Sequence, residues 1–195
     1  MGIVQESEYV GKRLLDLFFS VILLVLSVPL FLLIAIAIKL ESKGPVFYRH
    51  LRVGKFGRNF RMWKFRTMVQ GADKMGSGLT QYSDPRITKV GKFLRRFSFD
   101  ELPQIINVVV GDMSLIGPRP EIFEIVNLYT AQQREALNVR PGITGLTQIN
   151  GRDNLPLDAK LEIEREYVHN NSLWLDLKIL WLTFPAVWSG EGARY

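Results

Sequence analysis

The sequence predicts a helix-rich α/β protein in which one membrane-embedded helical segment is attached to a small domain. Residues 14–40 form an almost unbroken apolar run, and a helix needs only about 20 such residues to cross a bilayer. Residues 60–66 alternate with the period of a β-strand, whereas most of the later chain follows the period of amphipathic helices. The length of 195 residues suits one domain over 1–195. We expect its membrane segment over 11–40 and a cytoplasmic and interfacial part over 41–195.

Composition narrows the chemistry and the partners. Cysteine is absent and only two histidines are present, so disulfides, thiolate chemistry and a zinc site are not expected. The composition does not exclude a metal held by oxygen ligands. The net charge of +6 and the pI of about 9.6 suit an anionic partner, which is nucleic acid, anionic lipid or a phosphorylated substrate. The apolar run favours the last two, so nucleic acid is not expected.

The membrane segment contains a proline and is flanked by cations on both sides. Pro29 lies near its middle, where it removes one helical hydrogen bond and bends the chain. Lys12 and Arg13 precede the apolar run, and further cations follow it: Lys39, Lys43, Arg49, Arg52 and Lys55. Because cation-rich flanks tend to stay cytoplasmic, both ends of the segment are expected on the cytoplasmic side.

A helix that breaks at Pro29 and returns through the same leaflet accounts for both features. Its backbone must satisfy its own hydrogen bonds at the break, since hydrocarbon offers none. Ser27 is the nearby polar side chain that can bond a freed backbone group. An ordinary transmembrane helix kinked by proline is the alternative. A cleaved signal peptide does not fit, because the apolar run is too long and no small-residue cleavage site follows it.

Residues 41–97 are expected to form a hairpin, a loop and a basic helix. A turn at 41–45 precedes a short strand at 46–48, a basic turn at 53–59 and a second strand at 60–66. In the second strand Lys64 and Arg66 point the same way, either as a solvated face or as a clamp for a phosphate or headgroup. Residues 69–84 have the composition of a mobile loop, and 90–97 form a helix with cations on its outer faces.

Two adjacent carboxylates lie where we expect the chemistry. From Leu102, apolar residues recur every three and four positions and stop at Gly111, which places Asp100 and Glu101 at the N-terminus of a short helix. The structural interpretation is a capping box between Ser98 and Glu101. The functional interpretation is catalysis, because the pair follows a group of cations that suits an anionic ligand. These cations are Lys89, Lys92, Arg95 and Arg96.

Two loops rich in glycine and proline follow. In residues 117–120, Pro118 and Pro120 restrain Arg119, whose guanidinium is then suited to bind a diphosphate. A structural arginine is the alternative. The glycines of the second loop, residues 140–145, let backbone amides approach an anion. Helices are expected over 121–138, 157–170 and 172–182, and the tryptophans near the last one suit either the headgroup boundary or the core.

Several blocks of the sequence resemble the monotopic phosphoglycosyl transferases, bacterial enzymes that move a sugar phosphate from a UDP-sugar to polyprenyl phosphate. The run from Ser98 to Gln104 is similar to their catalytic signature, and blocks at 64–68, 111–120 and 140–152 match in the same order. The resemblance implies that Asp100 attacks the phosphorus that bears the sugar, that Glu101 assists, that UMP leaves, and that Asp100 helps to hold Mg²⁺. It also implies a re-entrant helix at the cytoplasmic face of the bacterial inner membrane.

The same resemblance implies the remaining site residues. The substrate-binding positions are Lys64, Arg66, Arg95, Pro118, Arg119, Arg140, Gln148 and Arg152, and the membrane positions are Lys12, Arg13, Ser27 and Pro29. The chain departs from the family pattern at two points. The usual Ser-Pro of the helix break is Val28-Pro29, and Glu164 stands where aspartate is common. Glu164 and Asp176 receive no role, and a homodimer is left open.

Two other functions are compatible with the composition. A non-catalytic basic adaptor would bind anionic lipid or nucleic acid, and it has no need of Asp100 and Glu101 in a basic pocket. A membrane phosphatase or pyrophosphatase would use the same aspartyl chemistry with water as the acceptor. Release of UMP from a UDP-sugar excludes the adaptor, and a requirement for polyprenyl phosphate excludes the phosphatase.

Overall fold

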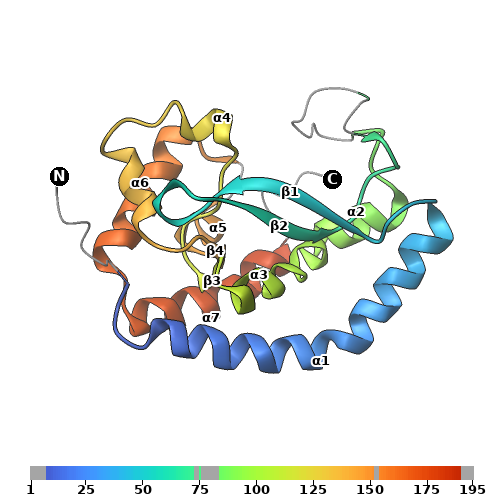
Figure 1. Ribbon diagram of the computed structural model, residues 1–195, viewed down its shortest axis with the longest axis horizontal. Helices are drawn as coiled ribbons and strands as arrows, with labels where there is room; N and C mark the ends of the chain where they lie inside the picture. Colours follow the sequence, from blue (N-terminus) through green and yellow to red (C-terminus); the bar gives the residue numbers. More distant parts are fainter. Residues whose placement is uncertain (1–7, 73–74, 76–83, 152–153, 190–195) are drawn as a thin grey trace.

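The computed structural model describes residues 8–72, 75, 84–151 and 154–189. Within them the predicted helix-rich α/β architecture is confirmed. A long helix, α1 (Lys12–Glu41), runs along one side of the remaining elements, and a two-stranded hairpin lies on the opposite side (Figure 1). The helices that carry the candidate site lie between these two layers. The predicted loop at 69–84 falls mostly outside the described residues.

Helix α1 stays helical through Pro29, so the predicted interruption of the helix at this residue is wrong. The helix instead changes direction partway along its length (Figure 1). Proline has no N–H, so the carbonyl four residues earlier loses its usual donor. The Ser27 hydroxyl donates to the carbonyl of Leu23 rather than to that freed carbonyl of Val25. Among the described residues, α1 is the one helix long and apolar enough to cross a membrane.

The N-terminal end of α1 is fastened to the rest of the protein by its two cations. Lys12 is buried, and its Nζ lies 2.5 Å from Oδ2 of Asp176. Arg13 donates to the carbonyls of Val108 and Val109 at 2.7 and 3.1 Å. Both side chains therefore point into the protein.

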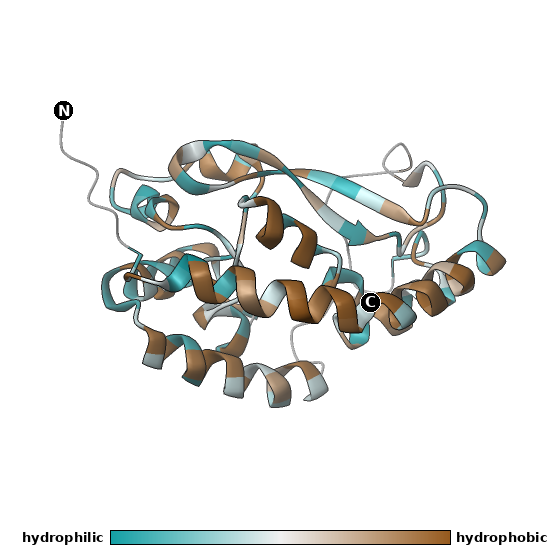
Figure 2. Cartoon of the chain, turned by 60° about the horizontal axis from the view of Figure 1, so that its bottom comes forward, coloured by the Kyte–Doolittle hydropathy of each residue, from teal (hydrophilic) through white to brown (hydrophobic). Residues whose placement is uncertain are grey.

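The C-terminal end of α1 is fastened to the same body. Ile34 and Ile38 pack in a buried cluster with Phe65 and Leu94. Between the two ends the side chains of α1 are mostly exposed and apolar, with exposed fractions of 71% at Leu26 and 66% at Leu33. Figure 2 shows that hydrophobic residues follow one another along most of α1.

The predicted hairpin is confirmed, with a longer first strand than expected. Strands β1 (Phe47–Val53) and β2 (Asn59–Phe65) are antiparallel, with Phe47 opposite Phe65. A 3-10 turn, η1 (Lys55–Gly57), joins them. From β2, Phe60 and Met62 are buried in one cluster with Val108 and Met113, which fixes the hairpin against the helix that follows the candidate site.

Three short elements surround the paired carboxylates. Helix α2 (Lys89–Arg96) agrees with the predicted basic helix, and helix α3 (Gln104–Val110) ends where predicted, at Gly111. The 3-10 turn η3 (Phe99–Glu101) lies between them. Gly91 packs so closely on the main chain of Thr67 that an added Cβ would lie 2.0 Å from its carbonyl oxygen. Only glycine therefore lets α2 reach this position.

The predicted helix over 121–138 is wrong. The chain forms a short helix, α4 (Phe123–Val126), and a separate 3-10 helix, η4 (Gln133–Asn138). Thr130 and Gln133 exchange two hydrogen bonds between side chain and backbone, at 2.9 and 3.2 Å. This reciprocal pattern is that of a capping box, which begins a new helical turn.

The rest of the chain adds a small sheet and three helices. Strands β3 (Ser114–Ile116) and β4 (Gly142–Thr144) pair in parallel, and helix α5 (Leu146–Ile149) follows. Helix α6 (Leu157–Asn170) has the predicted bounds, and α7 (Leu173–Ser189) extends past the predicted 172–182. The aromatic side chains of α7 are largely exposed rather than buried: Trp174, Trp181, Phe184 and Trp188.

Candidate active site

Asp100 and Glu101 form the 3-10 turn η3 between α2 and α3. Ser98 has a φ of +56°, in the left-handed region, so the chain turns sharply just before the pair. The side chain of Ser98 does not cap the turn, and the carboxylate of Glu101 is engaged by cations instead. The capping-box interpretation is therefore wrong.

Cations from two other elements meet at Glu101. Lys64 of β2 places its Nζ 2.8 Å from Oε1 of Glu101 and 3.9 Å from Oδ2 of Asp100. Arg119, from the loop after β3, donates to both oxygens of Glu101, at 2.9 and 3.5 Å. Residues from three separate parts of the sequence thus form one cluster, which we call the carboxylate cluster: Lys64, Asp100, Glu101 and Arg119.

The two carboxylates of the cluster have different electrostatic surroundings. Burial raises the pKa of Asp100, and the positive charge of Lys64 opposes this rise only in part. Burial also disfavours the ionised form of Glu101, but Arg119 and Lys64 overcome it and hold the pKa of Glu101 well below its usual range. Glu101 is accordingly ionised near neutral pH and pairs with two cations, whereas Asp100 is the more basic of the two carboxylates.

Two further predicted substrate residues lie on the segment that follows β2 and on α2. Arg95 donates from Nε to the Thr67 hydroxyl at 2.9 Å, and its charge favours the ionised form of Asp100. Arg66 donates to the carbonyls of Ser42 and Lys43 at 2.8 and 2.7 Å. Arg66 therefore fastens the chain that leaves α1, and its guanidinium does not join Lys64 at the carboxylate cluster.

The predicted substrate-binding residues of the later loops do not join the carboxylate cluster either. Arg140 pairs with Glu8 at 2.5 Å and donates to the carbonyl of Gly111 at 3.1 Å, so it lies at the end of α3 opposite to Asp100. Gln148 is buried, and its amide has no hydrogen-bond partner among the described residues. The carbonyl of Pro118 accepts from Gly142 at 2.8 Å and joins the two loops. Arg152 lies outside the described residues.

Three residues without a predicted site role are connected to the cluster or to α1. Arg52, on β1, lies near Arg119 and Glu101. The pKa of Arg52 is lowered, chiefly by burial and secondly by the positive charge of Arg119. Burial raises the pKa of Glu164 on α6 to about 7. Asp176 of α7 accepts from Lys12 and from two tyrosine hydroxyls, those of Tyr9 and Tyr167, at 3.0 and 2.8 Å.

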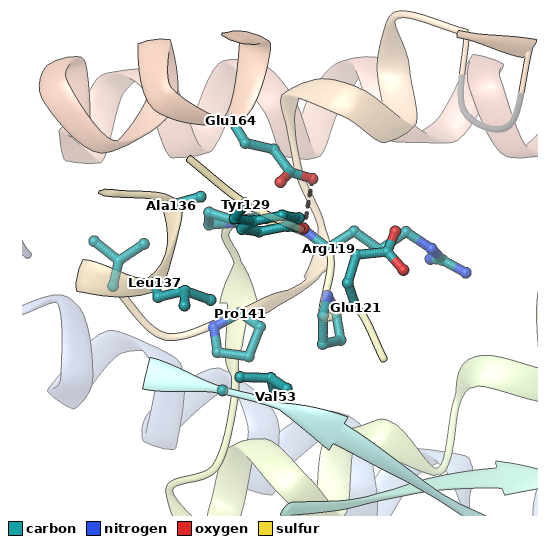
Figure 3. A pocket seen from close by; sticks show the side chains of 12 residues that line it. Val53, Arg119, Glu121, Tyr129, Ala136, Leu137, Pro141 and Glu164 are labelled. Carbon is teal, nitrogen blue, oxygen red and sulfur yellow. Dashed lines mark hydrogen bonds between the residues drawn. The ribbon is translucent and has the colours of Figure 1, made fainter. Parts of the chain in front are cut away.

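A cavity beside Glu164 is lined by residues of the Arg119 loop, β1 and the segment before β4 (Figure 3). Its free volume is about 10 Å³, which is room for roughly one water molecule. It is too small for a nucleotide sugar. The cavity is therefore not the binding site of such a substrate.

The donor set of the cluster suits a magnesium ion only in part. Among the residues that the structure describes, no group of three or more acidic or histidine side chains converges on one point. Protein sites for Mg²⁺ often supply just one or two carboxylates and leave the other positions to substrate phosphates and water. Asp100 fits such a site as the carboxylate ligand, with a diphosphate as the other partner.

Comparison with known proteins identifies the family of the chain. The model of the family described as "Bacterial sugar transferase" matches residues 7–190. An uncharacterized sugar transferase of Bacillus subtilis, EpsL, is 42% identical over 94% of this chain and 90% of its own length. The exopolysaccharide production protein ExoY of Sinorhizobium fredii is 36% identical over 98% of this chain and 92% of its own length.

A relative of defined activity is longer. The UDP-glucose:undecaprenyl-phosphate glucose-1-phosphate transferase of Escherichia coli is 43% identical over 88% of this chain, and the match covers 39% of that protein. The matched part includes the carboxylate cluster in the present chain, because it takes in most of the sequence. The chain therefore belongs to the bacterial sugar transferase family, and it is a phosphoglycosyl transferase.

Proposed function

We propose that this enzyme transfers a sugar 1-phosphate from a UDP-sugar to polyprenyl phosphate and releases UMP. The observation that carries the proposal is the carboxylate cluster, in which the buried Asp100 lies beside the carboxylate of Glu101 and two cations. The names of the relatives support the substrate class, since the Escherichia coli protein is named for UDP-glucose and undecaprenyl phosphate.

In the proposed reaction, an Asp100 oxygen attacks the phosphorus that bears the sugar. The bond from this phosphorus to the bridging oxygen breaks, and UMP leaves with that oxygen. A phosphate oxygen of the polyprenyl phosphate then attacks the same phosphorus and releases the Asp100 carboxylate. Such covalent catalysis replaces one difficult transfer with two easier ones.

The remaining residues of the cluster supply positive charge near the reacting phosphorus. Lys64 and Arg119 are ordered by Glu101, so their positive charge is available at the phosphorus without further side-chain ordering. Bound Mg²⁺ neutralises diphosphate charge, and Asp100 would hold it together with the donor. Arg95 adds a buried positive charge near Asp100.

We further propose that α1 enters and leaves the membrane on the cytoplasmic side. Both of its ends are bonded to the same body, through Lys12 and Asp176 at one end and through Ile38 and Phe65 at the other. A helix that crossed the bilayer would place these ends on opposite sides. The exposed aromatic residues of α7 suit the headgroup boundary, so the enzyme rests in one leaflet of the bilayer.

Asp100→Asn tests the reaction directly. A neutral amide cannot form the acyl phosphate, so the variant should release no UMP with saturating UDP-sugar and Mg²⁺. Wild-type enzyme without acceptor should gain the mass of a sugar phosphate on the peptide that contains Asp100. Asp158→Asn on α6 is the matched control and should behave as wild type.

Two outcomes would contradict the mechanism: turnover of Asp100→Asn near the wild-type rate, or a label on another peptide. Turnover that does not require polyprenyl phosphate would identify a phosphatase instead. A panel of UDP-sugars in the same assay identifies the sugar.

A further inference from the structure

The segment 118–120, which carries Arg119, has a single backbone donor. Pro118 and Pro120 lack an N–H, so the amide of Arg119 is the only one in this three-residue segment. It donates to Oε1 of Glu164 at 3.1 Å, and Figure 3 shows Glu164 reaching this loop from α6. The segment is therefore held by this bond to Glu164 together with the bond that the Pro118 carbonyl accepts from the Gly142 amide.

Arg119 is consequently held at both of its ends by carboxylates. Glu164 accepts from its backbone, while Glu101 accepts from its guanidinium at 2.9 Å. The side chain of Arg119 is 35% exposed, and a long side chain in such a place has considerable rotameric freedom to lose. A fixed backbone limits the region that the guanidinium can search, and so favours its contact with Glu101.

Glu164 is placed to act on the loop and not on a substrate. Its side chain is buried, with the residue 4% exposed, and the cavity beside it holds about one water molecule. Its Oε1 also accepts from the hydroxyl of Thr147 at 3.2 Å, which joins α6 to α5. A buried carboxylate is costly without such donors, so the arrangement has a structural cost that a function would explain.

We infer that Glu164 is a positioning residue that holds Arg119 in the geometry needed for phosphoryl transfer. The inference rests on the proposed function, because it assigns Arg119 a part in that reaction. It makes two specific statements. The effect of Glu164 on the rate passes through Arg119, and it requires an acceptor oxygen at this position rather than a negative charge.

The experiment combines three single variants with a double-mutant cycle. Glu164→Met keeps the volume and removes the acceptor, and Glu164→Gln restores an acceptor without the charge. Thr147→Val is the matched control, since it removes the other bond to the same oxygen. Glu164→Met is also made in the Arg119→Ala background, and kcat and KM for the UDP-sugar are measured on folded protein.

We expect Glu164→Met to lower kcat/KM at least tenfold in the wild-type background and less than twofold in Arg119→Ala. Glu164→Gln and Thr147→Val should stay within about threefold of wild type. Equal losses in both backgrounds would overturn the inference, because a purely structural defect reduces the active fraction regardless of Arg119. Failure of Glu164→Gln to restore activity would also overturn it.

Amide hydrogen exchange on the wild-type enzyme provides a second test if Glu164→Met does not fold. Arg119 supplies the one exchangeable backbone amide of the Pro-Arg-Pro segment, and it should be protected. Exchange at the rate of an unstructured peptide would overturn the inference. Absence of UMP release by the wild type would contradict the proposed function itself, whereas normal release with an unprotected Arg119 amide would contradict only the role of Glu164.

Discussion

Replacing Lys64 with methionine should make catalysis more sensitive to acid. The Lys64 ammonium lies 3.9 Å from Oδ2 of Asp100, and two unit charges about 4 Å apart interact by about 4 kcal/mol at an effective dielectric constant near 20. Glu101, at 2.8 Å from the same ammonium, offsets part of this. Even a third of the energy, about 1.4 kcal/mol, changes an ionisation equilibrium tenfold.

The sign of the effect follows from the two forces on Asp100. Burial raises its pKa and Lys64 opposes that rise, so removal of Lys64 lets the pKa rise further. The ionised nucleophile then needs a higher pH. In Lys64→Met the acid limb of kcat/KM for UMP release should move to higher pH, with at least a tenfold loss on that limb.

Two further variants make this prediction specific. Glu101→Gln should move the acid limb to lower pH, because the negative charge of Glu101 raises the pKa of Asp100. Lys92→Met removes the same charge from an exposed position on α2 and should leave the limb in place. A uniform loss of rate in Lys64→Met, with the limb unmoved, would refute the view that Lys64 acts on the ionisation of Asp100.

Three other predictions concern the scaffold. Lys12→Met leaves the buried carboxylate of Asp176 without its cation, which costs about 3 kcal/mol of folding free energy. The melting temperature in detergent should therefore fall by about 10 °C. An unchanged melting temperature would contradict the assigned ion pair. Gly91→Ala forces a Cβ to 2.0 Å from a backbone oxygen and should destabilise by about 3 kcal/mol in the same assay, so wild-type stability would show that α2 packs differently. Single cysteines at Val10 and Lys43 should both react from the cytoplasmic side in inverted vesicles, and reaction from opposite sides would establish a spanning helix.

The helices with strong periodicity were predictable, and the segments governed by local capping were not. Residues 157–170 form the predicted helix because its apolar positions recur regularly. Residues 121–138 share that periodicity, but the bonds between Thr130 and Gln133 divide the segment. The strands at 114–116 and 142–144 are too short to show a period of two. Their pairing depends on contacts that are distant in sequence.

The sequence identified the members of the carboxylate cluster but not all of their neighbours. Asp100, Glu101, Lys64 and Arg119 come together as a site because the hairpin and the loop after β3 meet at η3. Arg66 looked equivalent to Lys64, since the two alternate on one strand face. The strand ends at Phe65, however, and Arg66 instead meets the carbonyls that follow α1. Spacing along a strand cannot show where the strand stops.

Helix α1 and the candidate active site are connected through the termini of α2 and α3. At one end of α1, Glu41 accepts from the amides of Lys89 and Val90 at 2.7 and 2.9 Å, at the N-terminus of α2. At the other end, Arg13 donates to carbonyls at the C-terminus of α3. Each charge has the sign that stabilises the helix end it meets. Because η3 lies between α2 and α3, the bent helix holds both elements that flank Asp100. In the proposed arrangement, the depth of α1 in the bilayer would set the height of Asp100 above the lipid.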